Sequence, residues 1–256
     1  MLRIVSAAVS HPGLRREQNE DAYCARADLG LYVVADGMGG HAAGEVASRM
    51  AVDAIEAFVV ETRDGPPAGG WPMPYDPSLP LDGNRLTIGF QLANQSLAVA
   101  AAGNPALRGM ATTASAALTS DESVVLGHIG DSRIYLWRDG TLRQLTTDHS
   151  WVGDRIRAGM LSESDARQHP WRNVVTRAIT GGDDPLVDVI TVPAEDGDCL
   201  MLCSDGLSSV VPLAMMQEVL SAGHTLELTC RALVDAANDL GGPDNITVAL
   251  LRADVE

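Results

Sequence analysis

The sequence predicts an α+β fold built around antiparallel strands, and three observations support this prediction. Apolar, β-branched runs occur in groups along the chain and so do helical stretches, whereas a parallel α/β fold would alternate them. The hydrophobic fraction of 46% in 256 residues is enough for a sizeable core. Aromatic residues make up only 4%, so the core must consist mainly of Ala, Val, Leu, Ile and Met. We expect a single domain over residues 1–256.

Strands are expected where apolar and β-branched residues form short runs. These runs cover residues 3–10, 22–27, 31–35, 123–129, 133–138, 187–192, 199–203 and 246–251. The stretch YLWRDGTLRQL predicts a hairpin, because Asp139 and Gly140 can supply the positive φ angles of a tight turn.

Helices are expected where apolar residues recur at i+4 spacing. The expected helices cover residues 42–60, 84–102, 213–221 and 226–239, with two small pieces over 154–168. Residues 64–83, between the two long helices, contain six of the 13 prolines. Proline fixes φ and lacks a backbone donor, so we expect an extended surface loop there.

Composition excludes several classes of protein. The 34 acidic residues outnumber the 18 basic ones and give a net charge of −16, which repels nucleic acid and anionic membranes. No stretch approaches the roughly 18 apolar residues of a membrane span. The four cysteines form no CxxC pair and are expected to be reduced. We expect a cytoplasmic monomer.

The stretch LYVVADGMGGHAAGE, residues 31–45, allows two interpretations. Its glycines match the G-x-G-x-x-G/A fingerprint of dinucleotide-binding proteins, after a strand and before a helix. However, the charge of Asp36 at the strand end would repel a pyrophosphate. The helix leads to a Pro/Gly loop and another helix, not to the second strand of a βαβ unit. The alternative is a turn that presents a carboxylate to a metal.

Other acidic residues occupy similar positions. Asp36, Asp131 and Asp205 each follow an apolar run, and Asp244 precedes one. Each alone is typical of a turn, but together they could lie at one edge of a sheet core. Two carboxylates ~4 Å apart repel by about 4 kcal/mol at an effective dielectric near 20. Such a cluster needs cations, and hard oxygen ligands select Mg²⁺ or Mn²⁺.

Eight motifs in order extend over nearly the whole chain. They are GLRREQNEDAY, VVADGMGGHAAGEVAS, GMATTASAAL, GHIGDSRIYL, LTTDHS, RNVVTRAITG, LMLCSDGLSSVV and GGPDNITVALL. Together they resemble the metal-dependent serine/threonine phosphatases of the protein phosphatase 2C type, in the compact bacterial form. The resemblance implies a four-layer α-β-β-α sandwich, in which helices flank a central antiparallel β-sandwich. It also implies a small flap subdomain over about residues 150–180.

The resemblance implies roles for the residues at matching positions. Asp36 resembles the carboxylate that bridges two catalytic Mn²⁺ or Mg²⁺ ions, and the Gly37 carbonyl resembles a ligand of one of them. Asp205 and Asp244 resemble the remaining ligands of the other ion. Asp131 resembles the ligand of a third ion that bacterial members bind, shared with Asp205.

Further positions correspond to residues that act around the metals. Glu20 and Asp21 resemble groups that act through metal-bound waters. Arg16 resembles the arginine that binds phosphate, with Arg15 as its rival. His149 shows no metal-ligand spacing and is expected to be structural or solvent-facing.

The resemblance implies direct hydrolysis of phosphoserine and phosphothreonine in proteins. A hydroxide that bridges the metals attacks phosphorus without a phosphoenzyme, and the leaving alkoxide needs a proton. Eukaryotic members have a histidine where this chain has Met38. His41 could supply the proton or only support the loop, and a metal-bound water is a further alternative.

The implied partners are phosphoproteins and a cognate bacterial serine/threonine kinase whose action the enzyme counteracts. Two other functions compete with this one. A phosphatase fold that only binds phosphoproteins should have lost a metal aspartate or the arginine, but this sequence retains them. The hypothesis of a dinucleotide-binding oxidoreductase depends on the glycine fingerprint alone.

Overall fold

The computed structural model describes residues 2–39, 43–120 and 122–255, and its strands form two facing antiparallel sheets. The first sheet has the order β1 (Leu2–His11), β11 (Ile246–Val255), β10 (Cys199–Cys203), β7 (Arg133–Arg138) and β8 (Thr141–Gln144). The second has the order β2 (Asp21–Arg26), β3 (Leu31–Met38), β5 (Ala114–Thr119), β6 (Ser123–Ile129) and β9 (Asp188–Pro193). The short strand β4 (Ala111–Thr112) pairs with β3.

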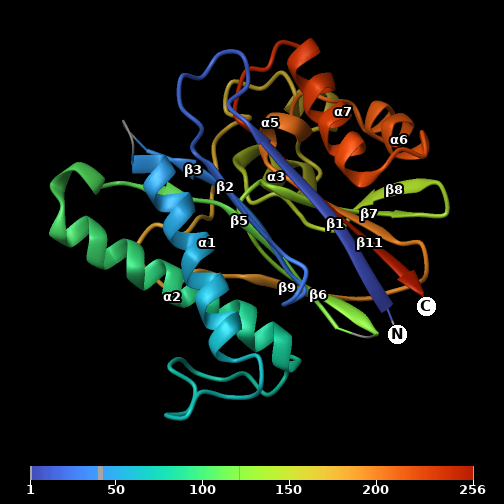
Figure 1. Ribbon diagram of the computed structural model, residues 1–256. Helices are drawn as coiled ribbons and strands as arrows, with labels where there is room; N and C mark the ends of the chain where they lie inside the picture. Colours follow the sequence, from blue (N-terminus) through green and yellow to red (C-terminus); the bar gives the residue numbers. More distant parts are fainter. Residues whose placement is uncertain (1, 40–42, 121, 256) are drawn as a thin grey trace.

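Helices cover the outer face of each sheet (Figure 1). The long helices α1 (Ala43–Glu61) and α2 (Leu81–Gly103) pack on the second sheet, and α6 (Leu213–Ser221) and α7 (Leu226–Asp239) pack on the first. The remaining helices are short: η1 (Pro105–Leu107), α3 (Trp151–Arg157), α4 (Glu163–Ala166) and α5 (Asp205–Ser208). This α-β-β-α arrangement confirms the predicted fold class.

Strand β3 shows how the sequence specifies the layers. Successive side chains of a strand point to opposite faces of the sheet. Leu31 and Val33 therefore pack in the core beneath α1 and α2. Tyr32 and Val34 point the other way, into the core between the two sheets. Because both faces of β3 are buried, its sequence is a continuous apolar run instead of an alternating one.

The short elements β4, η1 and α5 were not expected from the sequence, and two longer elements also differ from the prediction. Strand β5 was not expected, because its sequence ASAALT is rich in alanine, which favours helices over strands. Helix α2 begins at Leu81, so the last residues of the expected 64–83 loop are helical. Residues 62–80 contain no helix or strand, and the ring of Trp71 packs against Phe58 of α1 with ring centroids 6.1 Å apart.

The segment over residues 150–180 leaves the first sheet after β8 and returns to the second sheet at β9. It contains the short helices α3 and α4, and isolated β-bridges join Ser150 to Val175 and Thr112 to Ile179. The first bridge therefore joins the two arms of the segment to each other, and the second anchors the outgoing arm on β4. Among the described residues, no helix combines the length and the apolar character needed to cross a bilayer.

Leu126→Ala should lower the free energy of unfolding by roughly 2–5 kcal/mol, because it leaves a cavity in the core between the sheets, where Leu126 is fully buried. Urea denaturation measures this change. The matched control Leu228→Ala, at a position that is 51% exposed on α7, should change stability by less than about 0.5 kcal/mol. Equal losses from both variants would contradict the placement of Leu126 in the core.

Candidate metal centre

Two neighbouring strand ends bring three of the predicted acidic residues together. β3 runs antiparallel to β2, so Asp36 lies directly opposite Asp21. The backbone N–H of Gly37 donates to the carbonyl of Glu20 at 3.1 Å. A Cβ on Gly37 would lie 2.0 Å from the carbonyl oxygen of Gly44, so only glycine fits there. Like charges directly opposite each other on paired strands repel, so this end of the sheet carries an electrostatic penalty.

The facing sheet contributes two more carboxylates. Asp205 follows β10 and begins α5, and Asp244 precedes β11. Because β10 and β11 are antiparallel neighbours, the end of one lies beside the start of the other. A Cβ on Gly206 would lie 1.9 Å from the carbonyl oxygen of Asn245, so glycine is required for α5 to approach this strand.

Asp21 connects the two sheets through hydrogen bonds. Its Oδ2 atom accepts from the hydroxyl of Ser204 at 2.8 Å and from the hydroxyl of Thr247 at 2.6 Å. Its Oδ1 atom is buried and has no hydrogen-bond partner in the part of the chain that the structure describes. Sequence reasoning missed Ser204 and Thr247, since they lie 183 and 226 residues away from Asp21 and no local pattern marks them.

Asp131 lies in the turn between β6 and β7. The neighbouring Ser132 shares a hydrogen bond of 2.7 Å with the hydroxyl of Thr113, and this hydroxyl accepts from the backbone N–H of Asp36 at 3.1 Å. Thr113 therefore ties the turn that carries Asp131 to the end of β3. It belongs to the motif GMATTASAAL, but no local pattern marks it for a role.

Burial and mutual repulsion raise the pKa values of these carboxyl groups. Burial raises the pKa of Asp21 to about 7 and that of Asp131 to about 7, and the negative charge of Asp205 adds to both. Burial, followed by the charges of Asp21 and Asp205, raises the pKa of Asp36 well above its ordinary value. Burial and then Asp244 raise the pKa of Asp205. The groups therefore form one electrostatic unit.

The donor set fits a hard divalent cation. Every predicted ligand atom is a carboxylate or carbonyl oxygen, which suits Mg²⁺ or Mn²⁺, and bound positive charge would offset the repulsion. Among the described residues, no three His, Cys, Asp or Glu side chains converge closely enough to hold an ion by themselves. The carboxylates are close enough to raise one another's pKa values, but they do not converge on a single point. Water and substrate oxygens would therefore have to complete the coordination shell of each ion.

Arg16 lies beside the carboxylates. Its Nη2 atom is 2.7 Å from Oδ2 of Asp244, and its side chain is 52% exposed. The hydrogen bond to Asp244 is the main cause of its raised pKa, and the charges of Glu20 and Asp36 contribute. The rival Arg15 makes no hydrogen bond or ion pair with any residue that the structure describes. The sequence reasoning did not anticipate that Arg16 would pair with a predicted metal ligand.

The proposed proton donor His41 lies outside the described residues. Met38 ends β3, where it pairs with Ala111 of β4. The identity of the proton donor, whether His41 or a metal-bound water, therefore stays a prediction.

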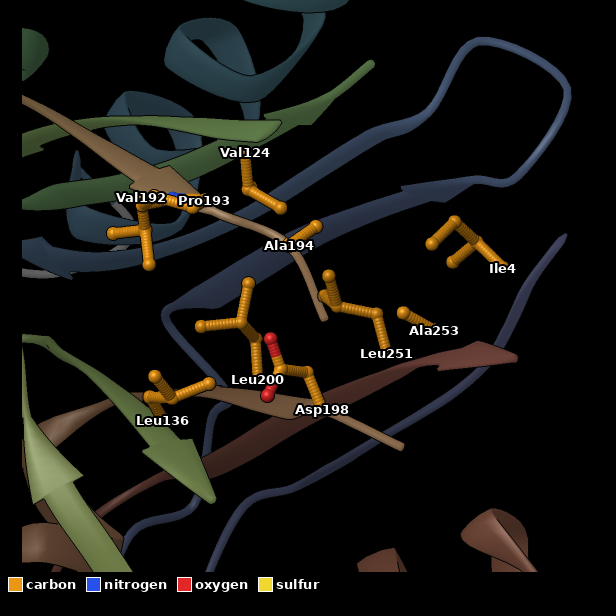
Figure 2. Close-up of a pocket in the computed structure, with 10 residues that line it drawn as sticks. All are labelled: Ile4, Val124, Leu136, Val192, Pro193, Ala194, Asp198, Leu200, Leu251 and Ala253. Carbon is orange, nitrogen blue, oxygen red and sulfur yellow. The ribbon is translucent and has the colours of Figure 1, made fainter. Parts of the chain in front are cut away.

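A second candidate region is a small cavity between the sheets (Figure 2). Its volume is about 20 Å³, which is room for about one water molecule. Its lining is apolar apart from Asp198, which forms an ion pair with Arg138. Asp198 precedes β10 and Asp205 follows it, so the cavity lies at the opposite end of the strands from the carboxylates.

Comparison with known sequences identifies relatives over nearly the whole chain. The family model described as protein phosphatase 2C matches residues 15–238. The serine/threonine phosphatase stp of Listeria monocytogenes is 38% identical over 249 residues, which are 95% of this chain and 93% of that protein. The protein phosphatase PhpP of Streptococcus pneumoniae is 35% identical over 249 residues, which are 95% of this chain and 95% of that protein.

Solved structures show the same similarity in three dimensions. The Mycobacterium tuberculosis serine/threonine phosphatase PstP/Ppp superposes with a TM-score of 0.86 at 35% identity, with 100% of both chains covered. The catalytic domain of PstP in complex with two manganese ions gives a TM-score of 0.85 at 34% identity, again with 100% of both chains covered. The chain therefore belongs to the protein phosphatase 2C family.

Proposed function

We propose that this protein is a metal-dependent protein phosphatase that hydrolyses phosphoserine and phosphothreonine in proteins. The observation that carries the proposal is the cluster of Asp21, Asp36, Asp131 and Asp205, whose pKa values are all raised by burial and mutual repulsion. Strongly perturbed carboxyl groups gathered at one place are typical of functional sites. The relatives named as serine/threonine phosphatases support this choice of substrate.

Two ions would be held by Asp36, the Gly37 carbonyl, Asp205 and Asp244. Asp131 and Asp205 would hold a third, and Glu20 and Asp21 would act through water. Bound Mn²⁺ or Mg²⁺ would supply an activated water and would neutralise charge on the phosphoryl oxygens. The PstP structure with two manganese ions supports Mn²⁺ as one such metal.

The chain's own residues orient the substrate. Arg16 carries a guanidinium fork that can bind two phosphate oxygens at once, which a lysine cannot do. Its half-exposed position beside Asp244 suits a group that meets a substrate from solvent. We propose that the phosphate and Asp244 share this guanidinium.

The state of the cysteines argues against one class of phosphoenzyme, the cysteinyl phosphate. Cys24, Cys199, Cys203 and Cys230 are all buried. Burial raises the pKa of each thiol to about 12. Thiolate is the reactive form of cysteine, so none of them is available as a nucleophile at neutral pH. We keep His41 as the candidate donor of the proton that the leaving alkoxide requires.

We further propose that the enzyme counteracts a serine/threonine kinase.

The non-catalytic alternative is less well supported, because a module that only binds phosphoproteins has no need for buried, mutually repelling carboxylates. The retained set of Arg16, Asp36, Asp205 and Asp244 lies within one electrostatic unit. Release of phosphate from a phosphothreonine peptide, with Mn²⁺, Mg²⁺ or chelator present, distinguishes the two functions.

Asp36→Asn should lower Mn²⁺-dependent hydrolysis of a phosphothreonine peptide by at least roughly 100-fold, because the neutral amide cannot take the bridging role. The fold should persist, since the change removes a repelling buried charge. Circular dichroism checks the fold, and phosphate release checks activity. Asp53→Asn, at an exposed position on α1, is the matched control and should retain activity. Full activity of Asp36→Asn would show that the bridging role is wrong.

Arg16→Ala should raise KM by about 10- to 100-fold, which is the effect of losing a charged hydrogen bond. Mn²⁺ affinity should not fall, because Asp244 loses a guanidinium that competes with the cation. Steady-state kinetics and calorimetric Mn²⁺ titration measure the two effects. The control Arg15→Ala should leave KM within about threefold. If Arg15→Ala raises KM and Arg16→Ala does not, the phosphate site has been assigned to the wrong arginine.

Without divalent cations, the protein should become more stable as the pH falls from 8 to 6. Asp21 and Asp131 have pKa values of about 7 in the folded protein, whereas carboxyl groups of an unfolded chain titrate near about 4. The folded state therefore binds more protons in this range, and stability is lost as the pH rises through about 7.

The melting temperature in chelator measures this dependence. Mn²⁺ should raise it most at pH 8, where the carboxylates are charged, because the ion binds only the folded state. Asp131→Asn should flatten the profile in chelator. The comparison with Asp131→Asn is the decisive one, because burial lowers the pKa of His128 to about 4 and this makes stability fall as the pH falls. Identical profiles for Asp131→Asn and the parent protein would contradict the clustering of these carboxylates.

A further inference from the structure

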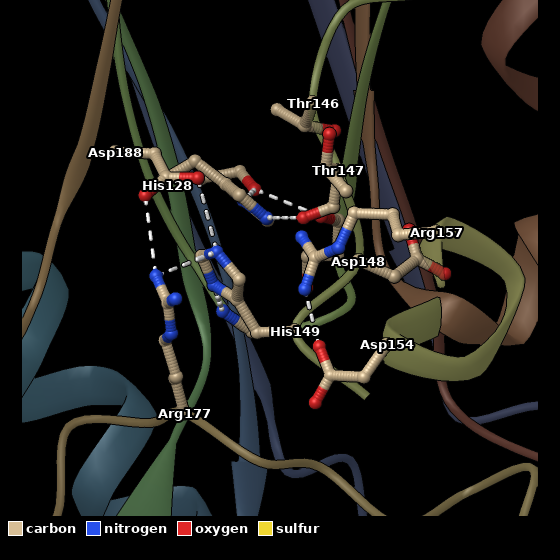
Figure 3. A network of polar contacts seen from close by, with 12 residues as sticks. His128, Thr146, Thr147, Asp148, His149, Asp154, Arg157, Arg177 and Asp188 are labelled. Atoms are coloured by element: carbon tan, nitrogen blue, oxygen red, sulfur yellow. Dashed lines mark hydrogen bonds and ion pairs between the residues drawn. The ribbon is translucent and has the colours of Figure 1, made fainter. Parts of the chain in front are cut away.

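His149 lies where the segment over residues 150–180 leaves the sandwich, and its side chain is fully buried (Figure 3). Its ring stacks on His128 with centroids 4.9 Å apart. The preceding residue, Asp148, is anchored by two hydrogen bonds from Arg133, of 2.9 and 2.7 Å. The backbone that carries His149 is therefore held in place from β7.

His149 binds both backbone polar groups of Gly130, the residue before Asp131. The N–H of His149 donates to the carbonyl of Gly130 at 2.7 Å. The N–H of Gly130 donates to the ring atom Nδ1 of His149 at 3.1 Å. The turn from Gly130 to Ser132 is thus held by His149 on one side and by the hydroxyl of Thr113 on the other.

The second ring nitrogen sets the tautomer. Nε2 lies 3.0 Å from Oδ2 of Asp188, the first residue of β9. A proton on Nε2 satisfies Asp188 and leaves Nδ1 free to accept from Gly130. The opposite tautomer would point two N–H groups at each other. Nη1 of Arg177 lies 3.3 Å from Oδ1 of Asp188 and also 3.3 Å from Nε2 of His149 (Figure 3). Because Asp188 accepts from both side chains, it keeps the proton on Nε2 despite this second donor.

This arrangement needs a neutral imidazole ring, with one nitrogen as acceptor and the other as donor. Burial lowers the pKa of His149, with Asp188 opposing and Arg177 adding to the shift. The carbonyl of His149 accepts from the N–H of Thr176 at 2.8 Å, so the same residue also holds the outgoing arm of the 150–180 segment.

We propose that His149 is a positioning residue for the metal centre: it fixes the turn that carries Asp131 and connects that turn to the 150–180 segment. This inference rests on the proposed role of Asp131 as a metal ligand. An apolar side chain would fill the same space, but it would leave the Gly130 N–H without a partner. Outer groups that orient a metal ligand typically change metal affinity by about 10- to 100-fold.

Two substitutions separate the functions of the two ring nitrogens. His149→Asn puts an amide oxygen close to the place of Nδ1 and retains an acceptor for Gly130. His149→Gln puts its amide close to the place of Nε2, so it can still donate to Asp188 but loses that acceptor. Asp188→Ala removes the acceptor of the Nε2 proton and leaves Arg177 as a donor 3.3 Å from Nε2, which favours the wrong tautomer, so it should act like His149→Gln. His224→Gln, at an exposed position, is the control.

Calorimetric Mn²⁺ titration and the Mn²⁺ dependence of kcat measure the effect, with melting temperatures in chelator as the check of the fold. His149→Gln and Asp188→Ala should weaken by about 10- to 100-fold the Mn²⁺ whose binding depends on Asp131, and should lower kcat, with KM for a phosphothreonine peptide unchanged. His149→Asn should stay within about threefold of the parent protein. In an Asp131→Asn background, His149→Gln should have no further effect on Mn²⁺ affinity, because coupled residues are not additive.

The inference is overturned if the Asn and Gln variants bind Mn²⁺ alike, or if they lose only melting temperature. It is also overturned if His149→Gln still weakens Mn²⁺ binding in the Asp131→Asn background. Failure of the proposed function is a separate result: the parent protein would then show no Mn²⁺-dependent hydrolysis at all.

Discussion

Buried and half-buried carboxylates at one edge of the two sheets repel one another, and the rest of the site is organised around that repulsion. Asp21 and Asp36 face each other across paired strands, and Asp205 and Asp131 approach from the other side. Charged groups are rarely buried together unless something compensates them. The strands hold these groups in place, so the metal-free protein stores unfavourable electrostatic energy that a divalent cation can release. The same cluster would thereby link stability and pH to the proposed catalysis.

A second set of polar groups holds the strand ends and the turn at this edge in place. Asp21 takes hydrogen bonds from Ser204 and Thr247 in the opposite sheet, and Thr113 joins the turn of Asp131 to β3. His149 holds the other side of that turn. Sites are most effective when supporting residues fix the reactive groups in advance. Here the support comes from segments far apart in sequence, so the sandwich must be complete before the site exists.

The sequence predicted the layers better than the contacts. Apolar runs such as 31–35 indicated the buried strands, and the acidic residues at their ends indicated the carboxylate cluster. β5 was missed because alanine carries little strand signal, although small side chains suit a central strand covered by helices. His149 was expected to be structural or solvent-facing. Its contacts depend on how the 128–150 region folds back on itself, and no local pattern encodes them.

The four buried thiols have a consequence for how the protein tolerates oxidants. Burial raises the pKa of all four thiols to about 12, so they stay protonated at neutral pH, and peroxides attack the thiolate. Hydrolases that depend on a reactive cysteine lose activity when that sulfur is oxidised. This chain gathers oxygen atoms instead of sulfur at its candidate centre, so oxidation of a cysteine would not remove a reacting atom.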